Sequence, residues 1–322
     1  MTPAFNYTDI SKYRSELMGW AIVWIMMLHF RFIHIKPLGF VAQYGFAGVE
    51  IFMLVSGFGL YYSLDKNNNI GQYFKRRILR IFPVYYIIGG FASIVLFHDD
   101  IFTYLFRCST IGFWIGGPFW EWYVPSIVAL YMVAPLLKKV IENNRMSFIA
   151  LMCILIIVAS YYVVANEIVG AKDPHFFLLY RIPAFIFGMI CAYWIKNETS
   201  VRYYYILLLI GIPCFLLLFP FHHVIYNFKY LSILFLLPVF TIIFITLSKY
   251  LKIINLVLST IGKASLEIYL IQAIFFNAII SGLFVVPSAW HDVITIGLII
   301  TSSLLGILVH KIIDKSGILR LI

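Results

Sequence analysis

Two ionisable side chains, His29 and Glu50, interrupt the first two long apolar stretches of this chain. Ionisable groups inside a bilayer are costly and are functional by default. A neutral imidazole can take a proton from a hydroxyl group, and a nearby carboxylate can hold its tautomer and stabilise the imidazolium. The pair therefore predicts general-base catalysis by His29, oriented by Glu50. The alternative is a packing role, with His29 bonded to a backbone carbonyl and Glu50 beside it.

An arginine-rich run precedes the third apolar stretch and contains Arg76, Arg77 and Arg80. The first and second of these lie four and three residues before Arg80, so they can share one helical face with it. Guanidinium groups suit bidentate phosphate binding. The run predicts a site for a phosphorylated donor, and the alternative is topology control with contacts to anionic lipid headgroups.

An aromatic segment, residues 119–125, contains Glu121, Trp122 and Tyr123. Aromatic residues at the end of a span are typical of the membrane interface. A carboxylate among stacking rings is also a common way to hold a sugar. Arg181 and Glu267 are the other ionisable residues at the ends of apolar stretches.

The elements that must position these residues are transmembrane helices. The chain is 62% hydrophobic and 12% charged, whereas soluble domains have about 45–50% apolar and about 25% charged residues. A span needs about 20 mostly apolar residues. We therefore predict an all-α integral membrane protein, a single polytopic domain over 1–322, with about ten transmembrane helices at 17–35, 44–64, 81–97, 119–137, 147–165, 180–195, 203–220, 231–248, 265–285 and 292–310.

The loops predict the orientation of these spans. With the N-terminus inside, most of the 24 lysine and arginine residues fall on the cytoplasmic side, as the positive-inside rule requires. An even number of spans places both termini in the cytoplasm. Segment 101–118 is apolar and rich in glycine, and we expect it to be interfacial or re-entrant, because an eleventh span would spoil the charge distribution. The net charge of +10 is spread over short loops, which indicates a lipid bilayer and no nucleic acid.

The motifs, in this order, resemble the membrane-bound acyltransferase family 3 of bacterial envelopes. The resemblance covers residues 12–285, and the family usually has arginine at the position of Met18, where Arg14, one turn earlier, is the candidate replacement. The late block often ends in histidine, where this chain has Gln272. The matching blocks are His29 with its preceding residues and the segments 48–58, 73–85, 120–135, 181–188 and 261–272.

The resemblance implies an O-acyltransferase in the inner (cytoplasmic) membrane, a multi-pass protein without a metal. It implies acetyl-CoA as the cytoplasmic acyl donor and a hydroxyl of an envelope glycan or lipid-linked sugar as the acceptor. His29 and Glu50 would be catalytic. The donor would be bound by Arg14, Arg76, Arg77, Arg80 and Tyr85, and the substrate by Glu121, Trp122, Tyr123, Arg181, Tyr269 and Gln272.

The main alternative is a transporter or flippase of a sugar or acyl-bearing envelope precursor, because ten spans with buried polar groups suit that class too. No internal repeat is visible in the sequence, which favours the enzyme. The sequence leaves the acceptor, the acyl chain of the donor, a covalent acyl-enzyme and a homodimer open.

Overall fold

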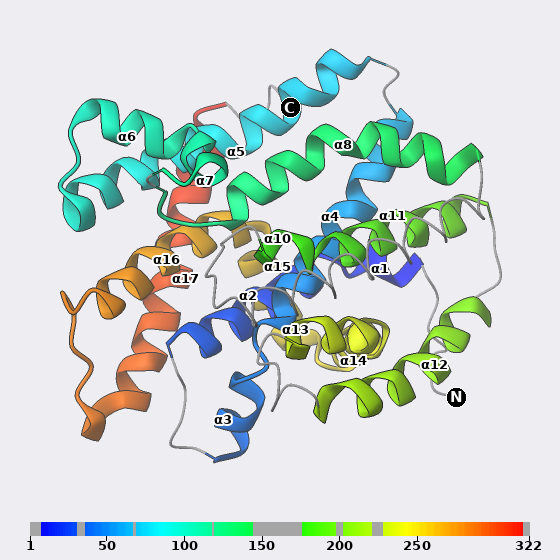
Figure 1. The fold of residues 1–322 in the computed structure, drawn as a ribbon. Helices are drawn as coiled ribbons and strands as arrows, with labels where there is room; N and C mark the ends of the chain where they lie inside the picture. Colours follow the sequence, from blue (N-terminus) through cyan, green and yellow to red (C-terminus); the bar gives the residue numbers. More distant parts are fainter. Residues whose placement is uncertain are drawn as a thin grey trace.

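A computed structural model describes residues 8–30, 36–66, 69–117, 119–143, 176–197, 202–220 and 228–317. These residues form helices and no strand, as the predicted fold class requires (Figure 1). The principal helices are α2 (Arg14–His29), α4 (Ala47–Lys66), α5 (Ile70–Ala92), α8 (Tyr123–Asn143), α11 (Ile182–Lys196), α12 (Arg202–Leu218), α14 (Leu237–Tyr250), α15 (Lys252–Lys263), α16 (Ser265–Ile280) and α17 (His291–Lys315). Shorter elements are α1 (Thr8–Lys12), α3 (Lys36–Ala42), η1 (Ser93–Phe97), α6 (Ile101–Cys108), α7 (Ile111–Ile115), α10 (Phe176–Leu179), α13 (Phe228–Ile233), η3 (Leu234–Leu236) and η4 (Ser288–Trp290).

Several of these helices are long and apolar enough to cross a membrane. By length and composition there are four within the described ranges: Ala47–Lys66, Ile70–Phe97, Tyr123–Asn143 and Ser288–Lys315. A fifth is the pair α15 and α16, if the two count as one span bent by 75° at its break. The shorter apolar helices Ile182–Lys196 and Leu234–Tyr250 also coincide with predicted spans. The predicted span 147–165 lies outside the described residues.

The described residues of segment 101–118 include two short helices, α6 with 8 residues and α7 with 5 residues. Neither is long enough to cross a bilayer, which takes about 20 residues. Asp100 caps α6 by accepting hydrogen bonds from the backbone N–H groups of Phe102 and Thr103. Arg107 forms a bidentate ion pair with Asp99 at 2.7 and 2.9 Å and donates to the carbonyl oxygen of Phe119. This clamp ties α6 to the start of the aromatic segment.

Glycines let the central helices approach to backbone contact. A Cβ atom on Gly57 of α4 would lie 1.9 Å from the carbonyl oxygen of Phe185, and one on Gly188 of α11 would lie 1.9 Å from that of Leu54. Small residues at helix interfaces permit this close packing in membranes. The contact is reciprocal, so each helix contributes a glycine to a groove that holds the backbone of the other.

Reciprocal glycine contacts also join α2 to α15. A Cβ atom on Gly19 would lie 2.2 Å from the carbonyl oxygen of Leu258, and one on Gly262 would lie 1.8 Å from that of Ser15. Helix α2 also packs on α4, where a Cβ atom on Gly48 would lie 2.5 Å from the carbonyl oxygen of Ala21. Helices α11, α4, α2 and α15 therefore pack in that order through glycine contacts.

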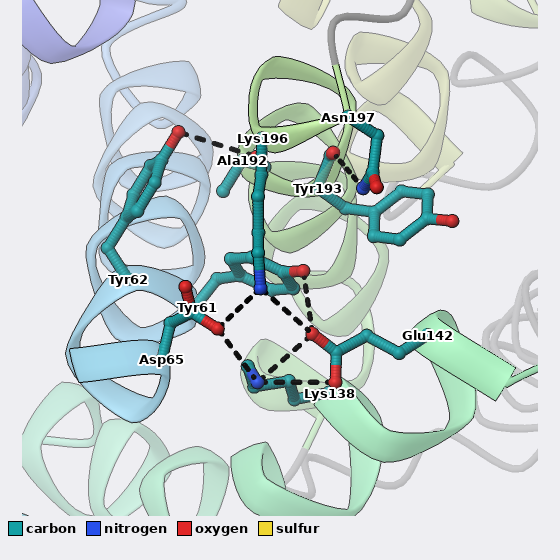
Figure 2. A network of polar contacts seen from close by, with 9 residues as sticks. All are labelled: Tyr61, Tyr62, Asp65, Lys138, Glu142, Ala192, Tyr193, Lys196 and Asn197. Carbon is teal, nitrogen blue, oxygen red and sulfur yellow. Dashed lines mark hydrogen bonds and ion pairs between the residues drawn. The ribbon is translucent and has the colours of Figure 1, made fainter. Parts of the chain in front are cut away.

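A charged network ties together the adjacent ends of α4, α8 and α11 (Figure 2). The ammonium group of Lys196 lies 2.6 Å from Asp65 and 3.8 Å from Glu142. Lys138 lies 3.3 Å from Asp65 and 3.0 Å from Glu142. The hydroxyl of Tyr61 donates to Glu142 at 2.9 Å. Two cations shared between two carboxylates thus connect the three helices at this end.

Candidate active site

A cavity of about 230 Å³ lies between α2, α4, α5, α8 and α16. Its described lining contains three arginines and five hydroxyl groups and no acidic side chain. The polar lining residues are Arg14, Arg77, Arg80, Ser56, Tyr123, Tyr131, Ser265 and Tyr269, and the remainder are Met18, Ile25, Val49, Phe52, Ile81, Ile127 and Leu266. A cavity lined by three arginines and, among the described residues, by no acidic side chain favours an anionic ligand.

Arg14 lies in this cavity beside Met18, one turn away on the same face of α2. Its guanidinium group packs against Gly59 of α4, where an added Cβ atom would lie 2.7 Å from Nη2 and 2.9 Å from Cζ. The missing side chain of Gly59 therefore makes room for Arg14. This placement supports the interpretation that Arg14 supplies the charge that Met18 lacks.

Only part of the arginine run on α5 lines the cavity. Arg77 lines the cavity, donates to the hydroxyl of Ser63 at 2.7 Å and lies 6.0 Å from the ring centroid of Tyr131. Arg80 also lines the cavity and donates to Glu267 at 2.7 Å. Arg76 is not among the lining residues. Two of the three predicted phosphate-binding arginines thus face the same space as Arg14.

His29 is hydrogen-bonded to Gln272, with 2.7 Å between Nδ1 and Oε1. An amide oxygen only accepts hydrogen bonds, so Nδ1 carries the proton in this contact, and in the neutral ring Nε2 keeps its lone pair. The ring stacks on Phe276 with 4.5 Å between centroids. On α2 and α16, His29 and Gln272 lie one turn beyond Ile25 and Tyr269, which line the cavity.

Glu50 has a different partner from the one we expected. Its carboxylate is 1% exposed and lies 3.8 Å from Nε of Arg181. Within the described ranges, no hydrogen bond joins His29 to Glu50, and neither oxygen of Glu50 has a hydrogen-bond partner. The guanidinium group of Arg181 lies 4.7 Å from the ring of Trp122 and 5.6 Å from that of Tyr230. In this structure the ring of His29 therefore contacts Gln272 and not, as we had expected, Glu50.

The aromatic segment brings Glu121 and Tyr269 together. Glu121 accepts a hydrogen bond from the backbone N–H of Val124 at 2.9 Å, which caps the start of α8, and one from the hydroxyl of Tyr269 at 3.3 Å. The rings of Tyr123 and Tyr269 lie 5.1 Å apart. Tyr85, predicted to bind the donor, stacks on Trp120 at 5.6 Å and is not among the residues that line the cavity.

Sequence reasoning missed the role of Glu267 and His310. The carboxylate of Glu267 accepts from both Arg80 and His310, at 2.7 and 3.0 Å between the nearest atoms. Glu267 was visible as an ionisable residue at the start of an apolar stretch, but no local signal links it to His310, 43 residues away. Among the described residues no group of three or more metal-ligating side chains is present.

Comparison with known proteins assigns this chain to a family. A protein of Acidianus two-tailed virus, provisionally named as an acetyltransferase, is 28% identical over 58% of this chain and 59% of its own length. The chain thus spans about three fifths of that relative. No solved structure gives a significant match. The acyltransferase domain family matches residues 17–310, which is most of the chain. This chain, whose described residues are helical, therefore belongs to the acyltransferase 3 family.

Proposed function

We propose that the protein is a multi-pass O-acyltransferase of the inner membrane, with about ten spans and both termini in the cytoplasm. It moves an acetyl group from cytoplasmic acetyl-CoA to a hydroxyl of an envelope glycan or lipid-linked sugar. The observation that carries this proposal is a cavity with three arginines at one end and His29 one turn beyond the other end.

The arginine end of the cavity suits the phosphates of the donor. Arg14, Arg77 and Arg80 come from two helices and face one space without an acidic lining residue in the described part of the chain. Fifteen residues separate Arg14 from His29, which is about 22 Å along α2. A pantetheine arm of roughly 15–20 Å, with the reach of the arginine side chains added, spans that depth within a bilayer core of about 30 Å.

His29 supplies the general base. Its Nε2 takes the proton of the acceptor hydroxyl as the oxygen attacks the thioester carbonyl carbon. The tetrahedral intermediate collapses, the C–S bond breaks, and the imidazolium returns the proton to the departing thiolate. Gln272 holds the tautomer in which Nε2 is free. The hydroxyl of Tyr123, on the cavity wall, is the candidate donor to the oxyanion, because the single hydroxyl proton of Tyr269 is donated to Glu121.

The acceptor side lies among groups outside the cavity, of which Arg181, Glu50 and Glu121 are buried and Trp122 is half-buried. Trp122 offers an aromatic face, and Arg181, Glu50 and Glu121 offer charged groups near it. Aromatic faces with carboxylates are typical of carbohydrate sites. We therefore assign the hydroxylated acceptor to this region, with Tyr123 between it and the donor cavity.

The test is acetyl transfer by the purified full chain in nanodiscs. Release of free thiol from acetyl-CoA is followed with and without a glycan pool from the envelope. His29→Asn removes the base, and His98→Asn is the matched control, because His98 is exposed with a φ of 53° that asparagine tolerates.

We expect wild type and His98→Asn to consume the donor and His29→Asn to lose activity by at least about 100-fold. If folded wild type neither binds nor consumes acetyl-CoA, the donor assignment is wrong, and transport of an envelope precursor becomes the leading function. If His29→Asn keeps full activity, the base is another residue.

A further inference from the structure

A buried carboxylate holds one arginine of the donor cavity in place. Glu267 is fully buried on α16, and its Oε1 accepts from Nη1 of Arg80 at 2.7 Å and from Nδ1 of His310 at 3.0 Å. Its Oε2 lies 3.4 Å from Nη2 of Arg80. The same Nη2 lies 3.4 Å from the carbonyl oxygen of Lys263, at the 75° break between α15 and α16.

We propose that Glu267 and His310 are positioning residues that fix the guanidinium group of Arg80 for a phosphate of the acyl donor. This inference rests on the proposed function. Neither residue lines the cavity, so both act through Arg80.

The geometry leaves Arg80 free to bind an anion. A guanidinium group has five N–H donors, and the contacts to Glu267 and Lys263 use no more than three of them. The side chain of Arg80 is 27% exposed and lines the cavity, so the remaining donors can face a ligand. A long side chain that is held before the ligand arrives loses less rotamer freedom on binding.

The arrangement also requires both partners of Glu267. A fully buried carboxylate without compensating hydrogen bonds is strongly unfavourable. Arg80 comes from α5 and His310 from α17, so Glu267 has one partner from each neighbouring helix. His310 satisfies a lone pair that Arg80 does not reach, and this keeps the carboxylate directed at Arg80.

The decisive variant is Glu267→Asp, which keeps the charge and shortens the side chain by one methylene group. We expect its KM for acetyl-CoA to rise about tenfold with kcat unchanged, as for the loss of one charge-assisted hydrogen bond. With S-acetylpantetheine, which has the thioester but lacks the nucleotide phosphates, wild type and variant should have equal KM values. Glu142→Asp is the matched control, because it alters an ion pair away from the cavity.

His310 gives a second and independent pair of variants. His310→Leu removes the hydrogen-bond donor and should raise the KM for acetyl-CoA. His310→Gln retains an N–H donor, so its KM should be close to that of wild type. Binding of coenzyme A and of pantetheine to the nanodisc protein, measured by calorimetry, gives the same comparison without turnover. The expected weakening is about tenfold for coenzyme A in Glu267→Asp and none for pantetheine.

Equal affinity for coenzyme A in wild type, Glu267→Asp and His310→Leu overturns the inference while the proposed function stands. An equal loss with coenzyme A and pantetheine also overturns it, because a general structural effect would not depend on the phosphates. Failure of folded wild type to bind coenzyme A is a different result, which removes the proposed function and this inference with it.

Discussion

The hydrogen bond between His29 and Gln272 gives the sharpest prediction about the proposed chemistry. Gln272→Met keeps the length of the side chain and replaces the amide oxygen by a thioether, which is a weak acceptor. The Nδ1 proton of His29 then loses its partner at 2.7 Å. Either the proton stays unpaired or it moves to Nε2, where it blocks the base.

The magnitude follows from the cost of an unpaired polar group. Gln272 is buried, and an unsatisfied donor in such a place costs about 1–3 kcal/mol. That cost disfavours the tautomer of His29 in which Nε2 is free to act as the base. If only this tautomer reacts, kcat falls by about 5- to 150-fold at unchanged KM for acetyl-CoA. The stack of His29 on Phe276 remains, so the ring stays in place.

The assay is thiol release from acetyl-CoA by the nanodisc protein, with thermal unfolding as the check on folding. Gln272→Glu is the matched control, because it retains an oxygen acceptor at the same position, and it should keep far more activity than Gln272→Met. A kcat for Gln272→Met within about twofold of wild type would falsify the tautomer argument. An equal loss in both variants would contradict it as well.

Three further predictions concern packing and charge. Gly59→Ala would place a Cβ atom 2.7 Å from Nη2 of Arg14 on α2. The KM for acetyl-CoA in initial-rate assays should therefore rise about tenfold. An unchanged KM would contradict the role given to the Arg14–Gly59 contact. In Gly57→Ala the new Cβ atom would lie 1.9 Å from the carbonyl oxygen of Phe185, so thermal unfolding should show an unfolding free energy lower by about 1–3 kcal/mol. In Gly297→Ala the new Cβ atom would meet nothing within 4 Å, so this control should be neutral or stabilising. Hydrogen bonds from Arg107 lower the pKa of Asp99, so the native ion pair stabilises the fold above the unfolded pKa of about 3.9 and the benefit is lost as the pH falls through the lower native pKa. Unfolding measured against pH should therefore show Asp99→Asn to be less stable than wild type by about 2 kcal/mol at neutral pH, with the difference shrinking below about pH 4, and a difference that does not change with pH contradicts this assignment.

The sequence was sufficient for a helical protein with membrane-length apolar helices and for the family, because both depend on patterns along the chain. Apolar runs predict membrane helices from composition alone, and the six motif blocks follow one another in order. Helical spacing placed Arg14 on the face of Met18 and put Arg76, Arg77 and Arg80 together, but it did not show that only Arg77 and Arg80 would line the cavity.

The partners of the buried charges were not accessible from the sequence. Depth along adjacent spans suggested that His29 meets Glu50, but depth says nothing about the rotation of a helix about its axis. That rotation directs Glu50 towards Arg181 and leaves His29 to Gln272, which is 243 residues away. The pairing of Glu267 with His310 depends in the same way on how α16 and α17 pack, and no local pattern encodes it.

The paired glycines of the central helices restrict how this protein can open for its substrates. Because the backbones of α4 and α11 touch at two reciprocal points, and those of α2 and α15 at two more, neither pair can separate without losing contacts along both helices. We therefore expect each pair to move together. Under the proposed function, we expect a donor to enter the cavity by movement of α5, α8 and α16, whose arginine and tyrosine side chains line it. His29, on α2, would then stay at a constant depth while the ligand enters and leaves.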